Sequence, residues 1–201
     1  MMRLKNTVLG LVLLIMGPFV LADADVDQAT QVVKDFQAEL ISVMKQGDKL
    51  DFEQRSAQLR PVLIKTHNMV RMTRAVMGKE WKVLSQEQKK QLITKLIDLS
   101  VASYAHHFSS FSGQSFVVKS TEKVRSQIYV KTFLVLPDDD DVSIDYLLKK
   151  KGDSWRIINI LSKGVSDIAL KRSEYGAIIK KSGFDVLLAE IQIKIKNFSK
   201  D

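Results

Sequence analysis

Apolar residues recur every three or four positions along the first half of the chain and again near its end. This spacing is typical of amphipathic helices. It predicts six of them, over about residues 26–44, 52–59, 69–76, 86–111, 165–181 and 184–198. Gly47, Gly78 and Gly183 stand where three of these helices should stop. Pro61 predicts that the second helix breaks or restarts there, because a proline inside a helix removes one hydrogen bond and crowds the preceding turn.

The strongest of these patterns lies in the middle of the chain. Ser85 and Gln88 have the spacing of a capping box, in which each side chain accepts a hydrogen bond from the other residue's backbone N–H. An apolar stripe with one serine then follows at helical spacing: Leu92, Ile93, Leu96, Leu99, Ser100, Tyr104 and Phe108. The pattern predicts a long helix that ends near Phe111.

The period changes to two residues after Gly113, which indicates strands. Alternating positions predict four of them, over about residues 116–119, 124–136, 142–148 and 155–161. The acidic turn 137–141 and the turn 151–153 are too short for crossover helices, so the strands should pair as antiparallel hairpins. Helices, then strands, then helices predict an α+β fold, with the helices packed on one face of a curved antiparallel sheet of about four strands.

The first 22 residues have the pattern of a secretory signal peptide. Arg3 and Lys5 precede the apolar run 8–16, and small residues follow around Ala22 and Ala24. We expect cleavage after one of these two alanines, leaving residues 23–201 as a single domain. No later stretch has the roughly 20 apolar residues that a membrane span needs. We therefore expect an extracytoplasmic protein.

The positive charge of the mature chain is concentrated in its last quarter. Residues 149–201 hold 12 basic and 6 acidic residues, whereas residues 23–148 balance at 17 of each. Because the predicted signal peptide precedes the mature chain, this excess of positive charge favours anionic lipid head groups or an acidic protein as the binding partner, and not nucleic acid. A solvated basic face without a partner would have the same composition.

The search for catalytic or metal-binding motifs fails. The chain has no cysteine, and its three histidines, His67, His106 and His107, lack metal-ligand spacing and are expected at the surface or at helix ends. Asp138–Asp141 lacks the glycine and glutamate of an EF-hand loop, so it is expected to be a solvated turn. Ser154 lies in a hairpin without the strand-to-helix elbow of a hydrolase. We expect no catalytic residue, metal or cofactor.

Large apolar side chains are abundant on both the long helix and the strands. A packed core and an apolar ligand cavity would use the same residues, so these patterns alone leave both alternatives open.

An ordered series of short motifs resembles the MlaC or toluene-tolerance family of periplasmic lipid carriers. It covers about residues 66–191, with Arg74, Gly78, Trp81, Ser85–Gln88 and Tyr104, then Phe111–Gly113, Asp145–Tyr146, Gly152…Trp155, Gly164–Ser166, Arg172–Glu174 and Gly183–Asp185. The segment Arg172–Tyr175 is most similar to the branch associated with hopanoid biosynthesis. Met77 and Thr66–His67–Asn68 depart from the usual family pattern, which leaves the ligand's identity open.

The resemblance implies a cystatin-like or NTF2-like sheet wrapped by N- and C-terminal helices around an apolar cavity. It also implies a periplasmic, monomeric carrier that holds acyl chains and shuttles phospholipid or a hopanoid-type lipid. The implied partner is an inner-membrane transport complex, to which the carrier is an ABC transporter auxiliary component. No catalysis is implied.

We place the implied cavity between the long helix and the strands. Its predicted lining is Trp81, Leu96, Ser100, Tyr104, Phe108, Val130, Thr132, Leu134, Ile144, Tyr146 and Leu148. The hydroxyls of Ser100 and Thr132 favour a cavity, because a packed core rarely holds two hydroxyls that face each other without partners. If this space is hollow, Val130→Trp should block lipid at little cost in stability.

Two rival hypotheses remain. A non-enzymatic assembly protein would have a filled, dry interior. A lipid-modifying enzyme would need reactive groups beside the cavity, for which Tyr104, Asp145 and Ser100 are the only candidates.

Overall fold

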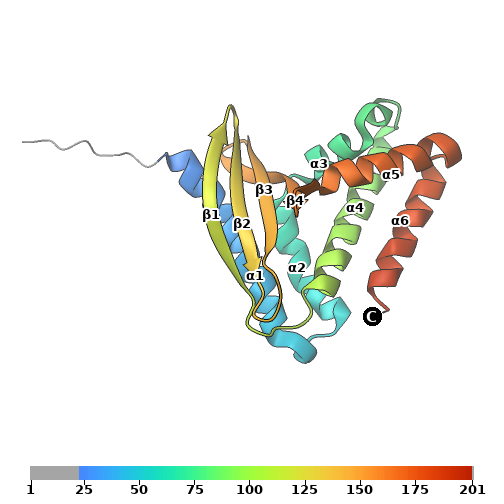
Figure 1. Ribbon diagram of the computed structural model, residues 1–201. Helices are drawn as coiled ribbons and strands as arrows, with labels where there is room; N and C mark the ends of the chain where they lie inside the picture. Colours follow the sequence, from blue (N-terminus) through green and yellow to red (C-terminus); the bar gives the residue numbers. More distant parts are fainter. Residues whose placement is uncertain (1–22, 201) are drawn as a thin grey trace, which may run out of the picture.

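The computed structural model describes residues 23–200, so the predicted signal peptide, residues 1–22, lies outside the described residues. Four α-helices precede the sheet in the chain and two follow it, and Figure 1 labels them. The helices are α1 (Ala24–Gln46), α2 (Phe52–Thr66), α3 (Met69–Met77), α4 (Gln86–His107), α5 (Asp167–Ser182) and α6 (Phe184–Phe198). The strands are β1 (Ser115–Val124), β2 (Gln127–Val135), β3 (Val142–Lys151), β4 (Ser154–Ser162) and β5 (Val165–Ser166).

The sheet is an antiparallel meander with the strand order β1-β2-β3-β4-β5. This confirms the predicted α+β class, with β5 as a two-residue addition at the edge. The first strand is longer than predicted and ends at a turn containing Arg125, whose φ is 56°. No glycine, proline or asparagine marks this turn in the sequence, so the alternation could not reveal where β1 ends and β2 begins.

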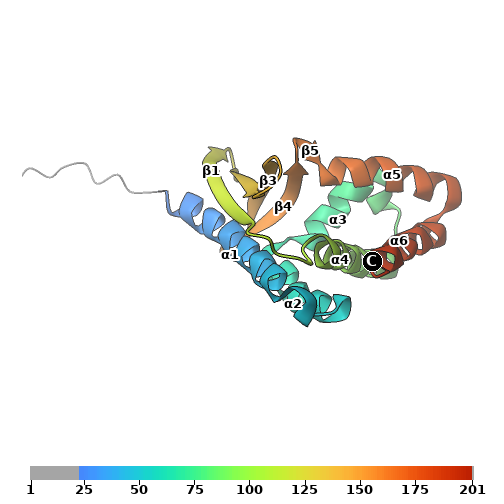
Figure 2. The same ribbon diagram turned by 60° about the horizontal axis from the view of Figure 1, so that its bottom comes forward.

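The first hydrophobic core lies between the sheet and α1, which runs across one sheet face (Figure 2). Val33, Phe36 and Leu40 of α1 are at most 1% exposed, because their helical spacing puts them on one face. They pack in the same cluster as alternate residues of the inner strands, including Val130 and Tyr146. The sheet face is therefore covered mainly by the first helix of the chain, whereas α4 contributes only residues near its C-terminal end, including Ala105.

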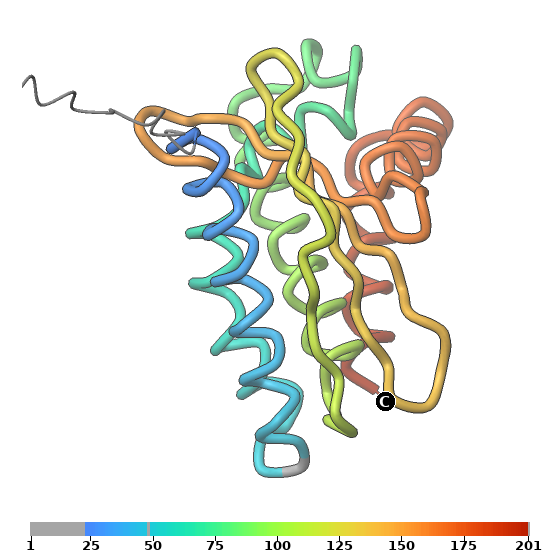
Figure 3. The backbone as a smooth tube through the Cα atoms, turned by 60° about the vertical axis from the view of Figure 1, so that its left-hand side comes forward, coloured from blue at the N-terminus to red at the C-terminus, as the bar shows by residue number. Residues whose placement is uncertain are grey.

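The second hydrophobic core is helical and contains side chains of α2 to α6. Leu92, Leu96, Leu187 and Ile191 are among its most buried members. Figure 3 shows α1 and α2 side by side, and α2 also packs on α4. Because α2 contributes side chains to both clusters, it joins the sheet part to the helical part of the fold.

The predicted break or restart at Pro61 is wrong, since α2 runs without interruption to Thr66. Leu59 and Leu63, on either side of the proline, are each 1% exposed, one in each core. An interior proline costs about 3 kcal/mol. Burying two leucine side chains contributes about 3–6 kcal/mol, which offsets that cost. Tertiary packing thus overrides the local preference.

The capping box at the start of α4 is confirmed. Ser85 Oγ accepts from Gln88 N–H at 3.1 Å, and Gln88 Oε1 accepts from Ser85 N–H at 2.9 Å. We expect Ser85→Ala to lower the free energy of unfolding by about 1 kcal/mol, since it leaves a helix-end donor unpaired. Urea unfolding measures this loss. Ser173→Ala, at an exposed interior position of α5, is the control and should change stability by less than about 0.5 kcal/mol. Equal effects of the two substitutions would contradict this account.

The N-terminal end of α1 is held to the sheet by ion pairs. Asp23 Oδ2 lies 2.7 Å from Lys123 Nζ in β1, and Asp25 Oδ1 lies 2.6 Å from Lys150 Nζ in β3. These hydrogen bonds to lysine lower the pKa of both carboxyl groups. Asp23 also caps the helix, because its side chain accepts from Asp25 N–H at 3.1 Å.

Candidate functional site

A cavity of about 450 Å³ lies where the end of the sheet meets α4, α5 and α6. This volume falls in the range of small-molecule sites. Buried side chains form its deep end: Leu63, His67, Met72, Leu99 and Tyr175. More exposed side chains of β5, α5 and α6 form its rim. The cavity is therefore apolar inside and open to water at one end.

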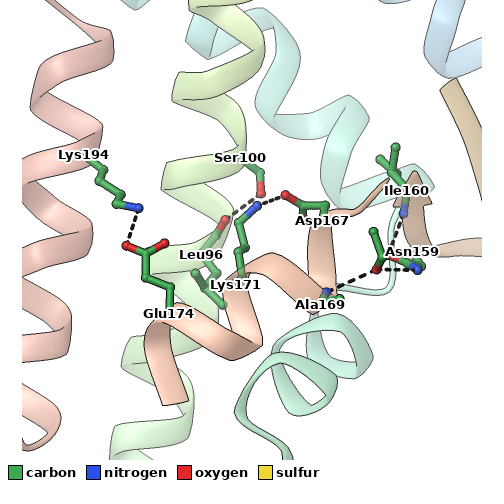
Figure 4. A network of polar contacts seen from close by, with 10 residues as sticks. Leu96, Ser100, Asn159, Ile160, Asp167, Ala169, Lys171, Glu174 and Lys194 are labelled. Carbon is green, nitrogen blue, oxygen red and sulfur yellow. Dashed lines mark hydrogen bonds and ion pairs between the residues drawn. The ribbon is translucent and has the colours of Figure 1, made fainter. Parts of the chain in front are cut away.

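The rim is charged, and Figure 4 shows its polar contacts. Lys171 pairs with Asp167 one turn earlier in α5, and Lys194 Nζ of α6 lies 2.5 Å from Glu174 Oε1 of α5. Surface pairs of this kind contribute only about 0–1 kcal/mol, so a ligand's charged group could replace either partner. The rim thus offers both cations and anions to a polar head group.

His67 is the polar residue at the deep end, and the prediction that it lies at the surface or a helix end holds only in part. It caps the C-terminal end of α2, but it is 5% exposed and packs edge-on against Phe36 at a centroid distance of 4.8 Å. Burial lowers the pKa of its imidazole to about 3, so the ring is neutral at neutral pH. The sequence marked His67 only as part of a segment that departs from the usual family pattern, and its burial was not predictable because it depends on α1 and α4 packing over it.

Tyr104 connects the cavity to both cores. Its ring packs edge-on against Phe36 at a centroid distance of 5.2 Å. The Tyr104 side chain also packs against both hydrophobic cores. Burial raises the pKa of its phenol well above the usual value, so the hydroxyl stays protonated.

Of the eleven predicted lining residues, Ser100 and Tyr104 line this cavity. Val130, Tyr146 and Leu148 are buried in the first core, and Phe108 and Ile144 pack against it. Leu96 is buried in the second core, against which Trp81 packs. Thr132 is fully buried and Leu134 is partly buried on β2. The strand residues face α1 because this helix occupies the sheet surface that the prediction gave to residues 86–111.

The two hydroxyls predicted to face each other without partners both have partners. Ser100 Oγ donates to the Leu96 carbonyl at 2.9 Å. Thr132 Oγ1 accepts from Gln37 Nε2 at 3.0 Å and donates to the Ile144 carbonyl. The argument from unpaired hydroxyls therefore fails for this pair.

A second hollow, wider and more open, lies between α1 and the edge strand β1. Lys34, Gln37 and Ile41 line one side of it, and Phe116 and Val117 line the other. Within residues 23–200, no group of three or more histidine, aspartate or glutamate side chains could hold a metal ion. In the same residues, no helix has both the length and the apolar composition to cross a bilayer.

The fold and the cavity together define a class of α+β proteins in which helices and a curved antiparallel sheet surround an apolar cavity with a charged rim. The family model described as MlaC protein matches residues 34–192, and the chain belongs to this family.

A similar solved structure is the phospholipid-binding protein from Ralstonia solanacearum in complex with a phospholipid. It is 17% identical, with a TM-score of 0.77, and the match covers 86% of this chain and 99% of that one. The likeness confirms the fold.

Proposed function

We propose that this protein is a lipid carrier that holds an acyl chain or a comparable apolar group in the cavity between the end of the sheet and helices α4, α5 and α6. The observation that carries this proposal is the cavity itself, with its buried apolar end and its charged, accessible rim. Each methylene removed from water contributes about 0.8 kcal/mol, so a long chain is retained without any covalent bond. The family and the phospholipid bound to the similar structure support the same function.

We extend the proposal to location and partners on the basis of the family. The carrier would work in the periplasm as a monomer and exchange phospholipid or a hopanoid-type lipid with an inner-membrane transport complex. The rim supports this exchange, because Lys171 and Lys194 can each leave a carboxylate partner for an anionic head group.

The two rival hypotheses have less support. A filled, dry interior does not match a cavity of about 450 Å³. An enzyme would need its reactive groups together, but Asp145 is not among the cavity-lining residues and accepts from Thr132 N–H at 3.3 Å on the sheet. Ser100 has its hydroxyl proton committed to a helix carbonyl. A binding role is the simpler interpretation.

Mass spectrometry of the gently purified protein tests the proposal most directly. We expect a lipid to co-purify and to be released by solvent extraction. Lipid-stripped protein should then take up a labelled phospholipid from vesicles. Absence of co-purified lipid together with absence of uptake would refute the carrier function.

The basic residues of the last quarter predict a salt-dependent docking step. Arg172, Lys180 and Lys181 lie on α5, the helix that also supplies part of the cavity rim. We expect delivery to anionic vesicles to slow as salt rises, because exposed charges are screened over about 8 Å at physiological ionic strength. Lipid already bound in the cavity should stay bound.

A matched pair of variants locates this docking surface. Lys180→Glu/Lys181→Glu on α5 should slow delivery more than Lys149→Glu/Lys151→Glu on β3. Lys149 and Lys151 lie at the opposite end of β3 from Ile144, which pairs with the cavity-lining Ser162. Stopped-flow transfer measured at several salt concentrations gives both rates. Salt-independent transfer would mean that these charges serve solubility alone.

We also propose that the signal peptide is cleaved after Ala22. Cleavage there keeps Asp23, which caps α1 and pairs with Lys123 at 2.7 Å. Cleavage after Ala24 would remove both interactions. The intact mass of the mature protein distinguishes the two sites.

A further inference from the structure

The hydrogen bonds around His67 determine which ring nitrogen carries the proton. Thr66 Oγ1 donates its only proton to the Val62 carbonyl at 2.7 Å. Toward His67 Nδ1, at 2.8 Å, the same oxygen can therefore only accept. A neutral imidazole has a single N–H, so that proton is on Nδ1 and Nε2 is left as a bare acceptor.

His67 Nε2 has no hydrogen-bond partner within the described residues, although the residue is buried, with only 5% of its surface exposed. Buried polar atoms are normally paired, and an unpaired one is costly. The ring lines the deep end of the cavity, between Phe36 and Tyr104. The missing donor is therefore expected from whatever fills the cavity.

Ser100 supplies a second, independent indication of the same chemistry. It lines the same cavity, and its hydroxyl proton is committed to the Leu96 carbonyl at 2.9 Å. Its oxygen can then only accept a further hydrogen bond. His67 Nε2 and Ser100 Oγ thus both offer acceptors on a wall that also carries the protonated hydroxyl of Tyr104, while the charged groups Lys171, Glu174 and Lys194 lie at the rim.

We propose that the cavity selects lipids that carry a hydroxyl group on their apolar part, with His67 Nε2 accepting the hydrogen bond from that hydroxyl. This inference rests on the proposed function and narrows its ligand class. A carbonyl or carboxylate would place a second acceptor against Nε2, and a plain hydrocarbon would leave Nε2 unpaired. An uncharged donor fits because the site is buried.

Two matched fatty acids test the selection. Lipid-stripped protein is titrated with hexadecanoate and with ω-hydroxyhexadecanoate, and shorter ω-hydroxy acids extend the series to vary how deep the hydroxyl reaches. We expect the best hydroxylated acid to bind at least about tenfold more tightly than its unsubstituted counterpart. His67→Phe should remove this preference while keeping the binding of hexadecanoate.

Thr73→Val is the matched control. Thr73 Oγ1 is also buried without a partner, but Thr73 does not line the cavity, so the preference should persist in this variant. A loss of preference in Thr73→Val as large as that in His67→Phe would overturn the assignment.

The ¹⁵N spectrum of the labelled histidine rings provides a readout that does not depend on affinity. We expect Nε2 of His67 to be unprotonated in the lipid-stripped protein and to shift when the hydroxylated acid binds. Thr66→Val removes the acceptor that holds the ring proton on Nδ1, so the proton should then also occupy Nε2. A protonated Nε2, or equal affinities for the two acids, would refute the selection and leave lipid carriage intact. Failure of both acids and of phospholipid to bind would instead refute the proposed function.

Discussion

Acidification from neutral pH to about pH 4 should lower the free energy of unfolding by about 3 kcal/mol through His67 alone. Burial lowers the pKa of this imidazole from 6.5 to about 3 in the folded protein. Between these two values the unfolded chain binds a proton that the folded protein does not bind, so stability falls as the pH falls. Each pH unit crossed in this window costs about 1.4 kcal/mol.

Urea unfolding of lipid-stripped protein at a series of pH values measures this slope. His67→Gln should flatten it, because glutamine does not titrate. Thr73→Val is the control and should keep the slope, since it replaces a buried side chain that does not titrate and leaves His67 in place. Asp23, Asp25 and His107 also have lowered pKa values and destabilise the protein at low pH, but they do so equally in all three proteins. Parallel slopes for wild type and His67→Gln would refute the assigned burial.

Two tryptophan substitutions should have opposite consequences. Ser100→Trp fills the cavity and should abolish lipid uptake with little loss of stability, because the new side chain enters open space and few neighbours have to move. Val130→Trp should instead cost about 1–3 kcal/mol, because Val130 is fully buried in the first core and a larger side chain overpacks it. The Val130→Trp protein that stays folded should still take up lipid.

Thermal melts and vesicle uptake on the same lipid-stripped samples separate the two effects. Ser100→Ala is the conservative control and should keep both stability and uptake near the wild-type values. If Val130→Trp blocks uptake at no cost in stability, the sheet face lines the binding site after all. If Ser100→Trp lowers the melting temperature and still takes up lipid, the cavity lined by α4, α5 and α6 is not the binding site.

Much of the fold follows from local patterns. The spacing of apolar residues predicted all six helices within a few residues, except that the second continues through Pro61 and the fourth ends earlier, at His107. The capping box at Ser85 and Gln88 formed as expected, since it involves only residues three apart. Short connections dictated antiparallel hairpins, and the meander follows from them.

The site was predictable only in part, because periodicity identifies the buried face of an element but not what covers that face. Ser100 and Tyr104 were assigned to the cavity from the stripe of α4, and they line it. Val130 and Tyr146 were assigned from the same kind of pattern, yet they pack under α1. The stripe of α1 was read only as a helix, and nothing local showed that it would compete with α4 for the sheet.

The sequence by itself determined the helices, the hairpins, the α+β class and the absence of a recognisable catalytic motif, since each depends on residues that are near one another in the chain. Only the tertiary structure decided where the hollow lies and which polar groups face it. α1 fills the sheet face, so the free space moves to the junction of α4, α5 and α6. The same packing buries His67 and leaves Nε2 without a partner among the described residues, because the burial depends on Phe36, Tyr104 and Ile157, which lie far from His67 in the chain.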